Sequence, residues 1–140
     1  MARIEQHVTR DVVAIDGGVT CTEAAKIMSE RKIGAVAVLE KGRTVGLVTE
    51  RDLVVRVLAD GLTGASPVRD AMRRDIPTVT PTSSEAECSH VMRDHYTRHL
   101  LVSEGERITG IISMRDVIRL MLEEKQTLID QLQSFIYDQR

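Results

Sequence analysis

Apolar and polar positions along the chain predict the same order of elements twice. Short apolar stretches at 12–15 and 76–79 predict the first strand of each copy. A Ser/Thr-x-x-Glu box follows each stretch, at Thr20–Glu23 and Ser84–Glu87, and predicts a helix start. Branched residues predict four further strands, at 35–39, 44–48, 100–102 and 108–112. With a second helix predicted after Thr49 and after Ser113, the order in each copy is β-α-β-β-α.

The sequence repeats itself without gaps at an offset of 64 residues. The segment Gly46–Leu53 falls on Gly110–Val117, and Glu23 and Met28 fall on Glu87 and Met92. We therefore predict a first repeat at 8–62, a linker with a short helical turn at 63–71, a second repeat at 72–124 and a helical extension at 125–140. Ser66 is predicted to cap the short turn, which runs through Met72.

A unit of about 60 residues buries little core by itself. Two such units packed sheet to sheet about a pseudo-two-fold axis would bury more, and small ligands tend to bind in clefts between similar halves. The predicted fold class is therefore α/β (α+β), with two β-α-β-β-α repeats and an extended C-terminal helix. Aromatic residues are limited to Tyr96, Phe135 and Tyr137, so the core is predicted to consist of aliphatic residues and methionines such as Met28, Met92 and Met121.

The last helix is predicted to continue from Met114 to about Tyr137, because this stretch contains neither Gly nor Pro. Its apolar residues keep near-heptad spacing, interrupted by Lys125. The first repeat has no counterpart to the last turns, so we interpret 127–136 as a homodimer contact added to the helices of the repeats. The alternative is that this tail folds back on its own domain.

The net charge of −2 gives no electrostatic reason to expect nucleic acid or an anionic membrane as partner. No apolar run is long enough to span a bilayer, and the N-terminal residues do not resemble a secretory signal. Cys21 and Cys88 lack metal-ligand spacing and are predicted to be reduced thiols, and Cys21 is predicted to be buried. The sequence therefore predicts a cytoplasmic protein.

Two segments carry candidate chemistry, Thr49–Asp52 and Ser113–Asp116, each placed where a strand ends and a helix begins. One reading is structural, because Ser/Thr-x-x-Asp is a helix-capping pattern. The other reading is a nucleotide clamp: the carboxylate accepts the ribose hydroxyls, while the preceding Arg51 or Arg115 and the helix N–H groups hold a phosphate.

Over about residues 8–124 the chain resembles the cystathionine-β-synthase (CBS) domain pair. The resemblance rests on the Thr/Ser-x-x-Asp motif after the last strand of each copy, on the β-α-β-β-α order and on the tandem arrangement. This resemblance implies two clefts for AMP, ATP, NAD-type or S-adenosyl ligands, each mixing residues of both repeats. By resemblance, the residues of one site are Ile111, Ser113, Arg115 and Asp116 with Val13, Ile33, Gly34 and Ala35. The residues of the other are Leu47, Thr49, Arg51 and Asp52 with Pro77, Thr97, Arg98 and His99.

Other chemistry has little support in the sequence. His95 and His99 are four residues apart and His90 is nearby, but His99 is predicted to begin a strand and no Cys or acid completes a zinc set. No nucleophile elbow or glycine-rich phosphate loop is present, so we predict no catalytic residue, metal or catalytic cofactor.

Three classes of function are compared. The favoured one is a non-catalytic regulatory sensor that binds an adenine nucleotide, with AMP as first choice and ADP, ATP, NAD(H) or S-adenosylmethionine as alternatives, and that is read by an unidentified protein target. An enzyme of the inosine monophosphate dehydrogenase kind needs a catalytic barrel for which 140 residues leave no room. The third is a constitutive dimerisation scaffold with empty clefts.

Overall fold

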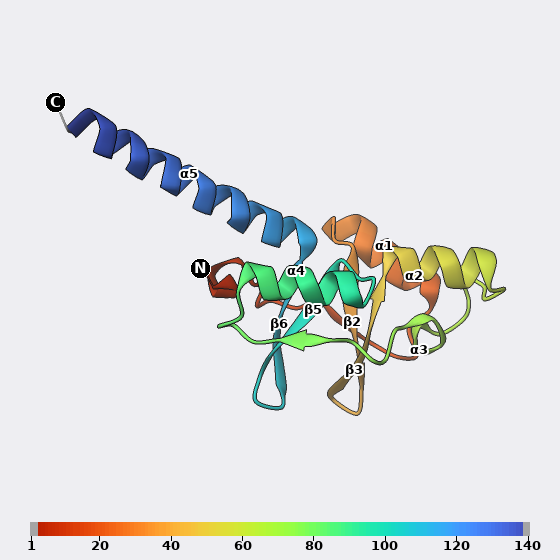
Figure 1. The fold of residues 1–140 in the computed structure, drawn as a ribbon. Helices are drawn as coiled ribbons and strands as arrows, with labels where there is room; N and C mark the ends of the chain where they lie inside the picture. Colours follow the sequence, from red (N-terminus) through yellow and green to blue (C-terminus); the bar gives the residue numbers. More distant parts are fainter. Residues whose placement is uncertain (1–2, 139–140) are drawn as a thin grey trace. The chain divides into compact units, whose positions relative to one another are not determined.

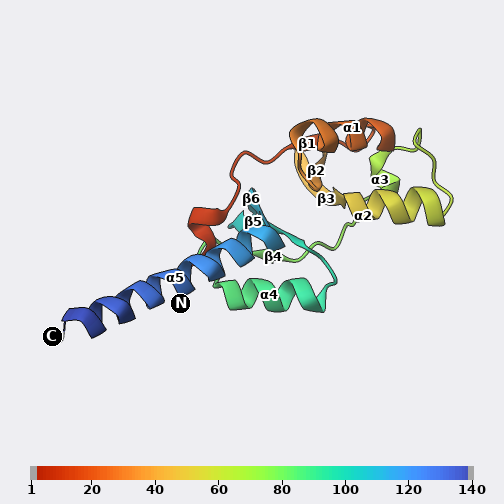
Figure 2. The same cartoon turned by 90° about the horizontal axis from the view of Figure 1, so that it is seen from above.

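The computed structural model describes residues 3–138 and divides the chain into two compact units (Figures 1 and 2). The repeat-1 unit is Asp11–Ile76. The repeat-2 unit combines Pro77–Arg140 with the N-terminal segment Met1–Arg10. The last two residues of the extension predicted at 125–140 lie outside the described residues.

The repeat-1 unit has the predicted β-α-β-β-α order. Its elements are β1 (Ala14–Asp16), α1 (Cys21–Arg31), β2 (Ala35–Glu40), β3 (Arg43–Thr49), α2 (Glu50–Leu53), a π-helical continuation η2 (Val54–Ala59) and the short α3 (Val68–Ala71). The sheet order is β1-β2-β3, with β1 parallel and β3 antiparallel to β2. Thr20 caps α1 as predicted, because its Oγ1 accepts the Glu23 N–H at 3.1 Å.

The repeat-2 unit has the same order and sheet topology. Its elements are η1, a 3-10 helix (Ile4–His7), β4 (Thr78–Val79), α4 (Glu85–Asp94), β5 (His99–Glu104), β6 (Arg107–Ser113) and α5 (Met114–Asp138). Ser84 caps α4 by accepting the Glu87 N–H, again as predicted. The long C-terminal helix is confirmed: α5 continues past α4 and the sheet of its own unit (Figures 1 and 2).

Each unit has its own aliphatic core. In the repeat-1 unit the buried cluster comprises Ile15, Cys21, Ala24, Met28, Val36, Val38, Val48, Val68, Ala71 and Met72. In the repeat-2 unit it comprises Ile4, Val79, Cys88, Met92, Leu100, Val102, Ile112, Val117 and Leu120. Met28 and Met92 are thus core residues as predicted, but the prediction for Met121 is wrong. Its side chain is 37% exposed and lines the open pocket between α4 and α5.

Each repeat is completed by the segment that precedes the other repeat along the chain. Thr9 pairs with Ile111 of β6 through two backbone hydrogen bonds of 2.9 and 3.0 Å. At the position 64 residues later, Arg73 pairs with Leu47 of β3 at 2.8 and 3.0 Å. The 3-10 helix η1 and the short helix α3 are likewise 64 residues apart, so the repeat extends further towards the N-terminus than the predicted start at residue 8.

One predicted cap is wrong, and one helix ends irregularly. Ser66 does not cap the short helix, because Pro67 occupies the N-cap position and the Ser66 Oγ accepts the Thr63 N–H instead. The second helix of repeat 1 ends as a π-helix at Ala59, where the Asp60 N–H bonds to the Val55 carbonyl. The β-branched residues Val54, Val55 and Val57 in this segment have low α-helix propensity.

Candidate functional site

The turn that joins β3 to α2 is a capping box built by Thr49 and Asp52. Oδ2 of Asp52 accepts the backbone N–H and the hydroxyl of Thr49, both at 2.9 Å, and the Asp52 N–H donates to Thr49 Oγ1 at 3.1 Å. Both side chains are half-buried. The structure therefore confirms the capping contacts of this segment.

The turn that joins β6 to α5 repeats this geometry with Ser113 and Asp116. Oδ2 of Asp116 accepts the Ser113 N–H at 2.9 Å and its hydroxyl at 2.8 Å, and the Asp116 N–H donates to Ser113 Oγ at 3.1 Å. The two turns make the same hydrogen bonds, so the sequence repeat extends to the conformation of these side chains.

Capping occupies only one oxygen of each carboxylate. Within residues 3–138, Oδ1 of Asp52 and Oδ1 of Asp116 make no hydrogen bond. An ionised carboxylate has about four lone-pair positions, so these free oxygens can still accept hydroxyl groups. Arg51 and Arg115 are exposed in the first turn of their helices, where backbone N–H groups and the helix dipole favour an anion.

The segment before the middle strand lies beside this turn in each unit. The Glu50 N–H donates to the Gly34 carbonyl at 3.0 Å, and Ala35 is the register partner of Thr49. Correspondingly, the Met114 N–H donates to the Arg98 carbonyl at 2.8 Å, and His99 pairs with Ser113.

Each unit holds eight of the sixteen predicted nucleotide-binding residues. The repeat-1 unit contains Val13, Ile33, Gly34, Ala35, Leu47, Thr49, Arg51 and Asp52, and the repeat-2 unit contains Pro77, Thr97, Arg98, His99, Ile111, Ser113, Arg115 and Asp116. Inside a unit the structure brings together residues that the prediction assigned to different sites, such as Gly34 with Thr49. Leu47 and Ala35 are buried in the sheet, so they would contribute backbone groups only.

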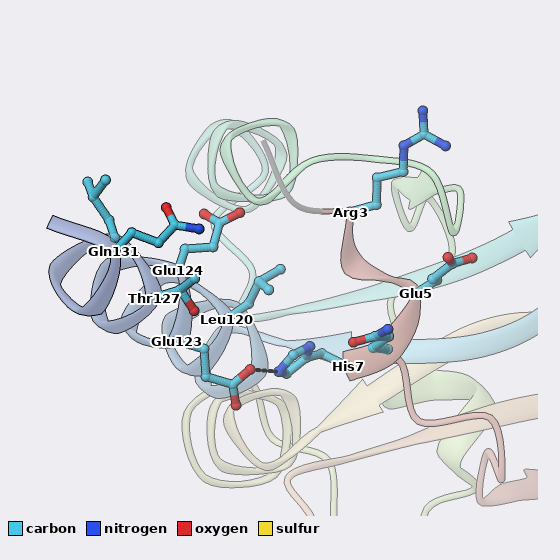
Figure 3. A pocket seen from close by; sticks show the side chains of 10 residues that line it. Arg3, Glu5, His7, Leu120, Glu123, Glu124, Thr127 and Gln131 are labelled. Atoms are coloured by element: carbon cyan, nitrogen blue, oxygen red, sulfur yellow. Dashed lines mark ion pairs between the residues drawn. The ribbon is translucent and has the colours of Figure 1, made fainter. Parts of the chain in front are cut away.

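Sequence reasoning missed an open groove of about 920 Å³ between η1 and α5 (Figure 3). It is lined by Arg3, Glu5, Gln6, His7, Leu120, Glu123, Glu124, Thr127, Leu128 and Gln131. Across it, His7 Nε2 lies 3.0 Å from Glu123 Oε2. The 64-residue offset, carried back to Ile4 and Val68, would have indicated that the N-terminal residues belong to a repeat.

A second pocket of about 230 Å³ lies between α4 and α5 and is lined by Glu85, Ala86, Ser89, His90, Arg93 and Met121. Burial, together with the nearby carboxyl of Glu124, raises the pKa of Glu85 above its usual value of 4.5. Neither pocket contains a predicted nucleotide-binding residue, so both are separate from the two capped turns.

Both cysteines are free thiols, and both are buried, as predicted for Cys21. Burial raises the pKa of Cys88 to about 11, and burial with the charge of Asp70 raises the pKa of Cys21. Among residues 3–138, no group of three or more His, Cys, Asp or Glu side chains is placed to hold a metal ion. His99 begins β5 as expected, whereas His95 follows the end of α4.

The paired geometry agrees with the comparison to known families, in which the CBS domain matches residues 4–59 and 68–123. The chain belongs to the CBS domain family. Both matches start before the predicted repeats and include η1 and α3, which is the extension that the structure shows. A tandem CBS pair is a regulatory type of module.

This CBS pair is similar to stand-alone relatives. CBS domain-containing protein YhcV of Bacillus subtilis (strain 168) is 29% identical over 117 residues, covering 84% of each chain. Hypoxic response protein 1 of Mycobacterium tuberculosis is 33% identical over 123 residues, covering 81% of this chain and 85% of that protein.

Solved structures show the same fold. A CBS-domain containing protein from Agrobacterium tumefaciens superimposes with a TM-score of 0.81 at 31% identity, covering 86% of this chain and 99% of that one. The CBS domain pair of protein MJ0100, solved with 5-methylthioadenosine and S-adenosyl-L-methionine, has a TM-score of 0.79 at 17% identity and covers 89% of this chain and 98% of its own. No helix within residues 3–138 is long and apolar enough to cross a membrane.

Proposed function

We propose that this CBS pair is a non-catalytic sensor of adenine nucleotides, with AMP as the first candidate ligand. The observation that carries the proposal is that capping occupies only one of the two carboxylate oxygens at each turn. Oδ2 of Asp52 or Asp116 fixes the turn, while Oδ1 remains available to the vicinal hydroxyls of a ribose. The adjacent arginine and helix N-terminus are suited to a phosphate.

Support for adenosine chemistry comes from a protein of the same fold. The CBS pair of protein MJ0100 binds 5-methylthioadenosine and S-adenosyl-L-methionine, both of which contain adenosine. In this CBS pair, the exposed Arg115 and Arg51 favour ligands that also carry phosphate, which is why AMP is placed before S-adenosylmethionine. The sequence-based prediction that each site also takes residues from the other repeat stays a prediction.

A constitutive scaffold is the second candidate. Its support is that capping alone accounts for every hydrogen bond that Asp52 and Asp116 make in the described part of the chain. On this view the two aspartates stabilise helix starts and bind no ligand.

We propose that the protein is a homodimer in which the outer half of α5 takes part. Large apolar side chains along α5 are more than a third exposed and recur at near-heptad spacing, among them Met114, Ile118, Met121, Leu122, Leu128, Ile129, Leu132, Phe135 and Ile136. A second copy presents the same stripe and would cover it symmetrically.

The second helix of repeat 1 also carries exposed apolar residues, at positions equivalent to exposed residues of α5. Leu58 is 80% exposed, and Leu122 is its equivalent in the second repeat. Val54 and Ile118 form a second exposed, equivalent pair. We therefore include the helices of both repeats in the proposed homodimer.

Isothermal titration of the full chain with AMP, ADP, ATP, NADH and S-adenosylmethionine tests the sensor proposal. We expect heat with AMP and a rise in Tm that follows ligand concentration. The Asp52→Ala/Asp116→Ala double variant is the control and is expected to lose both signals. Absence of heat with all five ligands would favour the scaffold instead.

A further inference from the structure

The contact between His7 and Glu123 joins the N-terminal segment to the helix α5. His7 Nε2 lies 3.0 Å from Glu123 Oε2, and the His7 side chain is only 12% exposed (Figure 3). The Nδ1 atom of the same ring is buried and makes no hydrogen bond within the described residues. The contact with Glu123 is therefore the polar interaction that holds this imidazole.

This contact has no counterpart in the first repeat. The residues 64 positions away are Ala71 in place of His7 and Ala59 in place of Glu123, at the end of α3 and at the end of the second helix. The pair thus occurs in the repeat whose second helix continues for several more turns. The two units otherwise have the same order of elements. We therefore infer that the His7–Glu123 contact serves the long helix α5.

The rest of the N-terminal segment is anchored at two further places in the same unit. Ile4 is fully buried, and its N–H donates to the Ser83 carbonyl at 3.0 Å, just before α4. Thr9 pairs with Ile111 of β6, two residues before Ser113. Gly110 permits this approach, since a Cβ there would collide with Val8 and lie 3.0 Å from the Thr9 carbonyl oxygen. Residues 4–9 therefore connect β6 to α5.

We propose that residues 4–9 form a strap that transmits nucleotide occupancy at Ser113–Asp116 to the outer half of α5, with His7–Glu123 as its attachment to the helix. The coupling rests on the proposed function, because it requires a nucleotide at the capped turn. A ligand that shifts the end of β6 moves the Thr9 pairing, and the strap passes this movement to Glu123. The distal part of α5, which follows Glu123, is the element whose stability or direction changes.

The first experiment tests the attachment without ligand. Hydrogen exchange followed by mass spectrometry, at a single protein concentration, compares the wild-type full chain with His7→Ala, Glu123→Ala and the double variant. Glu5→Ala is the matched control, since Glu5 is exposed on the same 3-10 helix. The double variant reproduces the Ala71 and Ala59 of the first repeat, where the surrounding unit is folded.

We expect both single variants and the double variant to exchange about fivefold faster than wild type in peptides covering 4–9 and 124–131, the size expected for loss of an ion pair whose carboxylate is more than half exposed. The double variant should not exceed the single variants, because both substitutions remove one contact. Glu5→Ala should match wild type. If His7→Ala and Glu123→Ala also match wild type, the strap is not attached through this pair and the proposal is wrong.

The second experiment repeats the measurement with saturating AMP. In wild type, AMP should slow exchange at 113–117 and change exchange at 124–137. In His7→Ala and Glu123→Ala, the protection at 113–117 should remain while the change at 124–137 disappears.

The remaining outcomes separate the two proposals. Suppose that AMP protects 113–117 from exchange. If the change at 124–137 is then absent from wild type, or persists in both variants, the coupling is wrong and nucleotide binding is still supported. If AMP protects nothing in wild type, the proposed function and the coupling both fail, and the ligand-free comparison still decides whether the pair holds α5.

Discussion

Asp116 accepts both the backbone N–H and the hydroxyl of Ser113 on the same carboxylate oxygen, Oδ2. The capping role and the ligand role of this residue are therefore compatible, because they use different oxygens. Asp52 and Thr49 share this arrangement. Stability and affinity should then respond differently to different substitutions at the same position.

Asp116→Asn should keep most of the folding stability and lose nucleotide affinity, because an amide oxygen can accept the two capping bonds but has no charge. Asp116→Ala should lose both: about 1 kcal/mol of stability from the cap and about 1.5–3 kcal/mol of binding free energy at that site. Urea unfolding and AMP titration measure the two quantities. Equal AMP affinity in wild type and Asp116→Ala would show that the aspartate is only a cap.

Truncation after Glu124 should loosen the homodimer and leave nucleotide binding nearly intact, because the proposed sites use no residue beyond Asp116. Light scattering across micromolar concentrations gives the dissociation constant. Leu132→Asp should act like the truncation, whereas Gln131→Asp, one position away and outside the apolar stripe, should have a smaller effect. A full-length monomer, or a truncated chain that stays dimeric, would contradict this use of α5.

Gly110→Ala and Gly46→Ala should each destabilise the fold by about 1–3 kcal/mol through overpacking. A Cβ on Gly110 would meet Val8 and the Thr9 carbonyl, and a Cβ on Gly46 would lie 2.8 Å from the Arg73 carbonyl oxygen. Thermal unfolding measures both losses. Because the two glycines occupy equivalent positions, a large loss at one and none at the other would contradict the equal packing of the two segments.

Glu85→Gln should stabilise the protein at pH 7 by less than about 1 kcal/mol, since the residue is partly exposed. Burial and the neighbouring Glu124 raise the pKa of Glu85, so the folded state favours its protonated form. For wild type, this residue's contribution to stability is therefore present below pH 4.5 and is lost as the pH rises through the folded pKa. Unfolding free energies from pH 4 to 8 should show a flatter profile for the variant than for wild type.

Ionisation of the Cys88 thiol should lower the free energy of unfolding above pH 9. Its folded pKa is raised to about 11 from 9.0 by burial, so the stability it contributes is complete below pH 9 and is lost as the pH rises through 11. The expected loss is at most about 2–3 kcal/mol. The difference between wild type and Cys88→Ala, measured by urea unfolding from pH 8 to 11, isolates this residue. A constant difference across that range would contradict the assignment.

The sequence by itself was sufficient for the local architecture. The capping boxes at Thr20 and Ser84, the strand patterns and the 64-residue offset depend on residues close together in the chain, and the structure confirms the elements they predict. The capped turns also follow from local spacing, because a hydroxyl and a carboxylate three residues apart meet across the first turn of a helix.

The tertiary structure decided what depends on residues distant in the chain. Nothing local to residues 3–9 indicates that Thr9 pairs with Ile111 or that Ile4 lies in the second core, because such pairing depends on free backbone groups at the edge of β6. The exposure of Met121 and the contact of His7 with Glu123 likewise depend on how α5 lies against its own unit. Helical periodicity identifies the apolar face of such a helix, but only packing determines which part of that face the core covers.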